Sequence, residues 1–110
     1  MHKHLLTTIT IVPLNTDIKT LVKSRIFAKY LHKLDIKFPQ VNTKDNKIIL
    51  VLQERLSSFN INNLIIDHQI HIAAQISEEL DSQVSILQTI DKEIIQNKQF
   101  TNGILLDIAA

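Results

Sequence analysis

Two histidines three residues apart, with an aspartate next to them, are the residues of this chain best suited to metal chemistry. They are His68 and His71, beside Asp67, in the stretch LIIDHQIHIAAQ. Imidazole nitrogens and carboxylate oxygens are common ligands of zinc and other transition metals. The recurring β-branched isoleucines, however, predict a strand over residues 64–73, and two residues three apart in a strand point to opposite faces. We therefore expect no metal site: His68 is predicted to be hydrogen-bonded at the boundary of sheet and core, and His71 to face solvent.

Other catalytic chemistry finds little support in the composition. The 110 residues include no cysteine and a single glycine, Gly103. The absence of cysteine excludes thiolate chemistry, disulfides and the common zinc frameworks, and one glycine cannot build a phosphate-binding loop or a dinucleotide fingerprint. The acidic pair Glu78–Glu79 falls at the predicted start of a helix, where the macrodipole favours carboxylates. We expect a non-enzymatic protein without a cofactor or a metal.

The two halves of the sequence carry opposite charge. Residues 1–55 contain ten Lys and Arg against four acidic residues, whereas residues 56–110 contain two Lys against seven acidic residues. Such an asymmetry can mark a nucleic-acid contact. It is equally consistent with two mixed surfaces that attract each other within one subunit or between subunits.

Basic residues gather in the first predicted helix. Arg25, Lys29 and Lys33 are spaced four residues apart and therefore form a row along one side of a helix. Such a row can neutralise phosphates and recognise RNA by its shape, but it is also typical of a solvated helix face. Few aromatic residues lie nearby, so stacking on unpaired bases is poorly supported. The predicted RNA-binding residues are Lys19, Lys23, Arg25, Lys29 and Lys33.

Hydrophobic periodicity predicts strands and a helix in the first half of the chain. Residues 5–12 alternate as a strand, which Pro13 ends because proline cannot donate to a β-ladder. A helix is predicted over residues 16–35, and a continuous apolar strand over 47–52. The piece 53–61 stays open between a short helix, a loop and a third strand.

The second half is predicted to continue as strand, helix and strand. A pair of adjacent asparagines predicts a hairpin turn before the strand at 64–73. Ser77 is a suitable N-cap, and apolar residues then recur in steps of three and four through a helix over 77–98. An Asn-Gly pair predicts the turn into a last strand at 104–109.

These elements predict one domain, residues 1–110, with an α+β fold. Both long helices carry an apolar stripe that must be buried, so we expect a two-layer sandwich with two helices on one face of an antiparallel or mixed sheet. The order β-α-β-β-α-β makes a ferredoxin-like arrangement the natural candidate. No stretch approaches the roughly 20 apolar residues that cross a bilayer, and the first residues lack a signal-peptide pattern. We expect a cytoplasmic protein without a membrane partner.

Several segments resemble the ribosome hibernation-promoting factor family. ISEELDSQVSILQTIDKEIIQNK, after the strand IHIAA, resembles the last strand and helix of that family, and NTDIKTLVKSRIFAKYLHKL is similar to its first helix. KIILVLQE is similar to its second strand, so the likeness covers about residues 5–100. The resemblance implies a non-enzymatic factor that sits in a channel of the small ribosomal subunit and blocks translation. The RNA contacts it implies in the first helix are Lys23, Arg25, Lys29 and Lys33. The net-acidic stretch 77–98 and the extra segment GILLDIAA depart from the family pattern.

The alternative function is a homo-oligomeric protein-interaction module. Edge strands such as 5–12 or 104–109 would pair between subunits, and the acidic half of one subunit would meet the basic half of its neighbour. The expected partner is therefore ribosomal RNA or another protein, with a homodimer as the simplest assembly.

Overall fold

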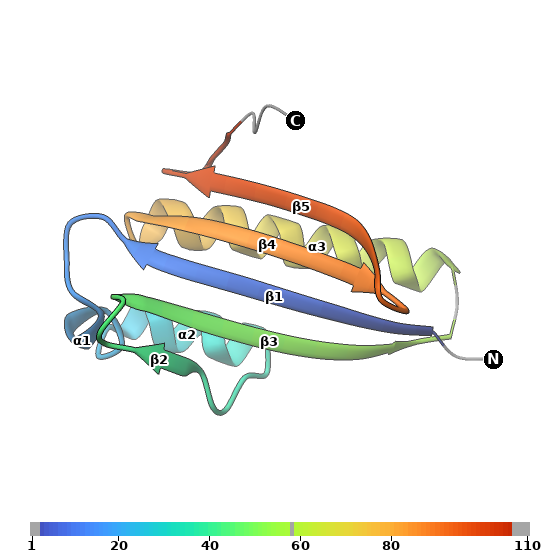
Figure 1. The fold of residues 1–110 in the computed structure, drawn as a ribbon, viewed down its shortest axis with the longest axis horizontal. Coiled ribbons are helices and arrows are strands. Elements are labelled where there is room, and N and C mark those ends of the chain that lie inside the picture. The colour runs from blue at the N-terminus through green and yellow to red at the C-terminus, as the bar shows by residue number, and fades with distance from the viewer. Residues whose placement is uncertain (1–2, 58, 107–110) are drawn as a thin grey trace.

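Six strands form one antiparallel sheet, and three helices lie on one of its faces (Figure 1). The computed structural model describes residues 3–57 and 59–106, which contain these elements. The strands are β1 (Lys3–Pro13), β2 (Gln40–Asn42), β3 (Lys47–Leu56), β4 (Ser82–Ile90), β5 (Glu93–Thr101) and β6 (Ile104–Leu105). The helices are α1 (Ile18–Leu21), α2 (Arg25–Lys33) and α3 (Phe59–Glu79). The strands follow one another across the sheet in the order β2-β3-β1-β4-β5-β6.

β1 occupies the interior of this sheet. It pairs antiparallel with β3 on one side and with β4 on the other, so that Ile9 lies opposite both Leu50 and Ile86. Alternate side chains of β1 are buried beneath the helices, and those between them are partly exposed. The predicted strand at 5–12 is confirmed. Its predicted role as a free edge for pairing between subunits is wrong, because both of its edges are already bonded.

The helix predicted over 16–35 is interrupted in the structure. Asp17 caps α1 by accepting the backbone N–H of Thr20 at 2.8 Å, and Ser24 caps α2 by accepting the N–H of Phe27 at 3.0 Å. Ser24 has an extended backbone with ψ of 147°, which an N-cap residue requires. The second cap therefore ends the helical path of α1 and starts a new one.

α3 replaces the turn and strand predicted before residue 74. Its buried side chains recur in steps of three and four, which is the period of a helix face packed on a sheet. They are Ile66, Gln69, Ile72, Ala73, Ile76, Ser77 and Leu80 just beyond its end. Burial of this face outweighs the preference of isoleucine for strands, which is a weak local tendency. The open piece 53–61 is divided between the end of β3 and the start of α3.

The helix predicted over 77–98 is wrong, because α3 ends at Glu79 and β4 and β5 form a hairpin. The buried residues of β4 alternate, but two of the four are polar: Ser82, Val84, Ile86 and Gln88. Because of these polar residues, the two-residue period of buried positions in β4 is not visible as an alternation of apolar and polar residues in the sequence. Asp91 and Lys92 form the connecting turn with φ angles of 49° and 75°, as a tight hairpin of this type requires.

The ferredoxin-like sandwich with two helices is therefore wrong, since the chain forms a larger antiparallel sheet with three helices. The predicted turn before the last strand is confirmed by positive φ angles at Asn102 and Gly103, 52° and 77°. Of the strand predicted at 104–109, only Ile104 and Leu105 form a strand, β6; Leu106 lies beyond it, and residues 107–109 lie outside the described part of the chain. No described helix is both long enough and apolar enough to cross a membrane.

Candidate functional site

The five predicted RNA-binding residues lie on α1, on α2 and in the turn between them. Their side chains are all exposed: Lys19, Lys23, Arg25, Lys29 and Lys33. The structure does not pair them with a second long helix from 77–98, because that segment forms the end of α3 and two strands. The cations are therefore confined to the short helices at one end of the sheet (Figure 1).

Lys29 is engaged within the chain. Its Nζ atom lies 2.8 Å from Oε2 of Glu79, in the last turn of α3. The macrodipole disfavours a carboxylate at a helix C-terminus, and the Lys29 ammonium compensates for it. Hydrogen bonding to Lys29 and then to Tyr30 holds the pKa of Glu79 below its usual value. This contact joins α2 to α3 and brings a charge of the basic half against a charge of the acidic half in one subunit.

Tyr30 forms the apolar base of the same contact. Its ring is buried, and the ammonium groups of Lys29 and Lys33 lie 4.8 and 5.5 Å from the ring centre. At such distances a cation is attracted to the face of an aromatic ring. Burial raises the pKa of the Tyr30 hydroxyl, and the neighbouring Glu79 raises it further. Two of the five predicted RNA contacts thus have partners inside the protein.

His68 and His71 lie on α3 and not on a strand. Residues three apart on a helix are neighbours, so the opposite faces that we expected for these two histidines are wrong. The described residues still contain no group of three or more His, Asp or Glu side chains placed to hold a metal ion. Nε2 of His71 lies 3.1 Å from Nε2 of Gln75 on the exposed side of α3, whereas His68 lines a cavity. The absence of a bound metal stays a prediction.

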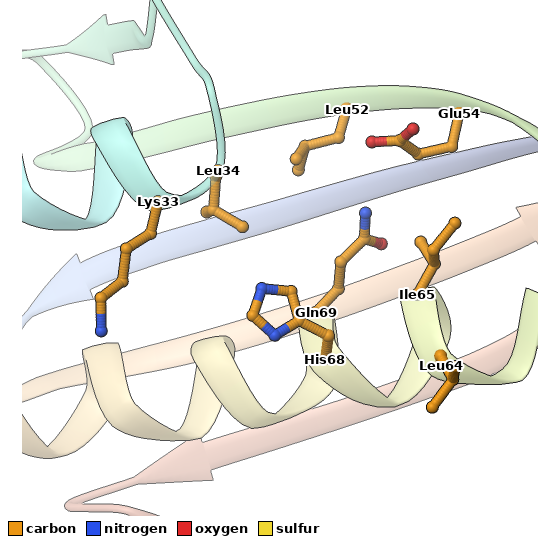
Figure 2. A pocket seen from close by; sticks show the side chains of 8 residues that line it. All are labelled: Lys33, Leu34, Leu52, Glu54, Leu64, Ile65, His68 and Gln69. Carbon is orange, nitrogen blue, oxygen red and sulfur yellow. The ribbon is translucent and has the colours of Figure 1, made fainter. Parts of the chain in front are cut away.

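A cavity of about 320 Å³ separates the end of α2 from the first half of α3 (Figure 2). Leu34, Leu52, Leu64 and Ile65 give it a largely apolar lining, and polar groups of Lys33, Glu54, His68 and Gln69 border it. α2 ends while β3 continues beneath the helix layer, so this part of the sheet is covered only by α3 (Figure 1). The gap is a consequence of the short second helix.

A buried polar network lies at the base of this cavity. Oγ1 of Thr7 donates a hydrogen bond to Oε1 of Gln69, and Nε2 of Gln88 donates to the same oxygen at 2.9 Å. All three side chains are buried, and Oε1 of Gln88 has no hydrogen-bond partner among the described residues. Gln69 also reaches the cavity, where its amide nitrogen points toward Leu52 and Glu54 (Figure 2). Sequence reasoning missed this network, because a buried glutamine in a half-polar segment looks like a surface residue.

β3 leaves most of its outer edge unpaired. β2 pairs only with residues 47–49 of β3, since Pro39 directly precedes β2 and cannot donate to the ladder. From residue 50 to residue 56 no other described strand bonds to that edge. A second cavity, of about 430 Å³, lies between the edge and the connection 34–38. Phe38, in that connection, is 89% exposed.

The sheet face opposite the helices, called the open face below, combines exposed apolar residues with hydroxyl and amide side chains. Four exposed apolar residues on the long strands lie in two neighbouring cross-strand rows: Leu6, Val51, Leu87 and Ile94. Eight positions around them carry uncharged side chains: Thr8, Thr10, Ile49, Gln53, Ser85, Thr89, Asn97 and Gln99. The charged turn Asp91–Lys92 borders Leu6 and Thr89, with which it lines a further cavity. Lysine and arginine occur on the described strands of this face only at the two ends of β3, as Lys47 and Arg55.

Comparison with known proteins adds no assignment to these surfaces. No protein-family model, curated protein or solved structure matches this chain. Function is therefore inferred from three features of the molecule: the open face, the basic residues of α1 and α2, and the cavities beside β3.

Proposed function

We propose that this protein is a non-enzymatic interaction module that forms a homodimer through the open face of its sheet. The observation that carries the proposal is the uncharged centre of that face, with Leu87 on β4 and Val51 on β3 more than a third exposed. An antiparallel sheet with one solvated face normally carries polar side chains at its outward positions. Contiguous exposed apolar residues surrounded by polar ones are instead typical of protein–protein contacts.

The open face has roughly the area that a stable dimer needs. The four long strands contain 11, 10, 9 and 9 residues. With a rise of about 3.4 Å per residue and a spacing of about 4.8 Å between strands, they cover on the order of 600 Å² as a flat surface. Side-chain relief increases the accessible area toward the roughly 800 Å² per partner of a standard interface.

A second copy of this chain is the partner that fits the face. A two-fold axis places the same surface on both sides of the contact, so any charge near the centre would meet its own copy. The centre of the open face has no charged side chain to repel its copy. Two such faces can pack about 10 Å apart with interdigitating side chains, and the hydroxyl groups of threonine and serine supply hydrogen bonds across the contact.

The test is the oligomeric state of a variant with a charge at the centre of the face. Sedimentation equilibrium should show a dimer for the parent and a folded monomer for Leu87→Lys, because dimerisation would bury an unpaired ammonium. Leu64→Lys is the matched control, since Leu64 is 70% exposed on α3 in the opposite layer, and it should remain dimeric. A parent that is monomeric at several hundred micromolar, or a Leu87→Lys dimer as tight as the parent, would overturn the proposal.

RNA association is a second candidate, favoured by three cations at one end of the molecule. Lys19, Lys23 and Arg25 are exposed and make no ion pair with the described residues. Each phosphate that they neutralise would release counterions, so affinity should fall steeply with salt. Replacing all three by glutamine should weaken binding to ribosomal RNA and flatten the salt slope by about two to three units. Equal binding by parent and variant, or no binding by either at low salt, would exclude this candidate.

A further inference from the structure

We propose that the outer edge of β3 accepts an extended peptide of a partner protein as an additional strand. The free stretch runs over residues 50–56, beyond the three residues that β2 covers. Every second residue of such an edge directs its N–H and C=O groups outward. A peptide backbone in extended form is the ligand whose donors and acceptors repeat with the same spacing. Seven residues of this edge measure about 24 Å.

The cavity along β3, called the outer cavity below, is the space in which an added strand would lie, and the cavity between α2 and α3, called the inner cavity below, adjoins it on the helix side. They share Leu34, Leu52 and Glu54, so the cavity between α2 and α3 and the cavity along β3 are adjacent. Side chains of a strand alternate between the two faces of a sheet. Every second side chain of the peptide therefore faces the helix layer and its cavity, and those between lie beside Val51 and Gln53 on the open face.

The chemistry of the inner cavity selects an apolar side chain at the alternate positions. Leu34 and Ile65 line it, and Leu52 rises from β3 into it (Figure 2). Gln69 is 2% exposed, and its amide nitrogen points into the cavity while its oxygen is bonded to Thr7 and Gln88. The peptide is thus apolar at every second position, with this amide available to a carbonyl or other acceptor.

The space between the free edge of β3 and the connection 34–38 is called the groove below. A single extended chain fits this groove better than a folded second copy does. The connection 34–38 runs along the outside of β3 and forms the far wall of the outer cavity. Two copies meeting at this edge would bring two such connections into one space. Phe38 is 89% exposed on this wall, where it can pack on a narrow peptide. The inference does not rest on the proposed dimer, because the free edge of β3 offers its backbone groups to a peptide whether or not the open face is paired; the two surfaces meet at Val51 and Gln53.

The test begins with a random peptide library displayed on phage and selected on the Leu87→Lys protein, which keeps the proposed dimer contact out of the experiment. The expected peptides have apolar residues at every second position. In a synthetic copy of the best peptide, methylation of single backbone nitrogens should weaken binding about tenfold at alternate positions only, since each loses one hydrogen bond. Fluorescence polarisation of the labelled peptide gives the dissociation constants.

Variants of the protein then locate the peptide. Phe38→Ala and Leu64→Ala are both changes at exposed side chains beside the groove, and each should weaken peptide binding at least fivefold. Ile104→Ala is the control, because Ile104 is 66% exposed on β6 at the opposite edge of the sheet, and it should leave binding unchanged. The inference would be overturned if the selected peptides show no alternation of apolar residues, or if methylation at every backbone nitrogen leaves the affinity unchanged. It would also be overturned if neither Phe38→Ala nor Leu64→Ala weakens peptide binding. A dimer of Leu87→Lys that Phe38→Ala dissociates would also overturn it, because the groove would then hold a second copy.

Discussion

The two faces of the sheet differ in what the folded monomer requires of them. On the covered face, most inward side chains of β1, β3 and β4 are buried, and three buried polar side chains, Thr7, Gln69 and Gln88, are bonded to one another. On the open face, apolar side chains such as Val51 and Leu87 remain in contact with solvent. Packing of the monomer accounts for the first face and leaves the apolar residues of the second unexplained. If the proposed dimer forms, the difference teaches that stability and association reside in alternate residues of the same strands.

The strongest test of this contrast uses two adjacent residues of β4. Ile86 is fully buried and Leu87 is 36% exposed. Ile86→Ala should lower the free energy of unfolding by about 3 kcal/mol through lost burial and a cavity. Leu87→Ala should lower it by less than about 0.5 kcal/mol in the monomer and should weaken the dimer instead. Urea denaturation at protein concentrations well below the dissociation constant of the dimer measures the loss of unfolding free energy for both variants. Equal losses would contradict the division between the two faces.

The polar network provides a test on the covered face alone. Gln69→Leu removes the acceptor shared by Thr7 and Gln88, which leaves Nε2 of Gln88 with only a longer hydrogen bond of 3.4 Å to Oγ1 of Thr7. We expect a loss of about 2 kcal/mol. Gln88→Met is the matched change, since it removes one donor together with the carbonyl oxygen that has no partner. It should cost clearly less than Gln69→Leu in the same urea titration. If Gln88→Met proves the more harmful change, the network does not depend on the shared oxygen of Gln69.

The smallest expected effect concerns the ion pair between Lys29 and Glu79, which joins α2 to α3. Lys29→Met should lower stability slightly, because the ion pair with Glu79 is partly exposed. The pKa of Glu79 is lowered in the folded protein from a usual value of 4.5. Its contribution is therefore complete above about pH 4.5 and is lost as the pH falls through the lower folded value.

The measurement is the difference in urea midpoint between parent and Lys29→Met from pH 7 down to pH 3. This difference should shrink on the acidic side of pH 4.5 and should also shrink at high salt. A difference that grows on acidification would mean that the Lys29–Glu79 pair does not stabilise the contact between α2 and α3.

The first half of the fold could be predicted from the sequence where pattern and local chemistry agree. β1 combines alternating apolar residues with a terminating Pro13, and the start of β3 is a continuous apolar run. The break between α1 and α2 was missed because Ser24 looks like an ordinary helix residue until its backbone is seen to be extended. The exposed basic residues of the candidate RNA site could likewise be predicted from their spacing. The ion pair of Lys29 with Glu79 could not be predicted, because the two residues lie 50 positions apart in the sequence.

The second half was mispredicted because two periods compete in it. Leu80, Val84, Leu87 and Ile90 occur at steps of three and four, yet Val84 is buried and Leu87 faces the other side of the sheet. In α3 the converse holds, since β-branched isoleucines occupy a helix whose buried face includes Gln69. In both segments a buried polar residue interrupts the period that the fold uses. The cavities and the free edge depend on where elements end, which local patterns do not determine.

The interior position of β1 also determines when this protein can fold during its synthesis. Leu5 lies opposite Glu54 on one side and Ile90 on the other, so β1 precedes both of its partners in the chain and cannot be fully paired until β4 has been made. Until translation has passed residue 90, this alternating segment with strong β-propensity lacks one of its partners. Such long-range pairing slows folding and leaves strand edges open to wrong contacts. A nascent chain truncated inside β4 should therefore be a substrate for chaperones, and premature termination should yield insoluble fragments in place of a smaller folded protein.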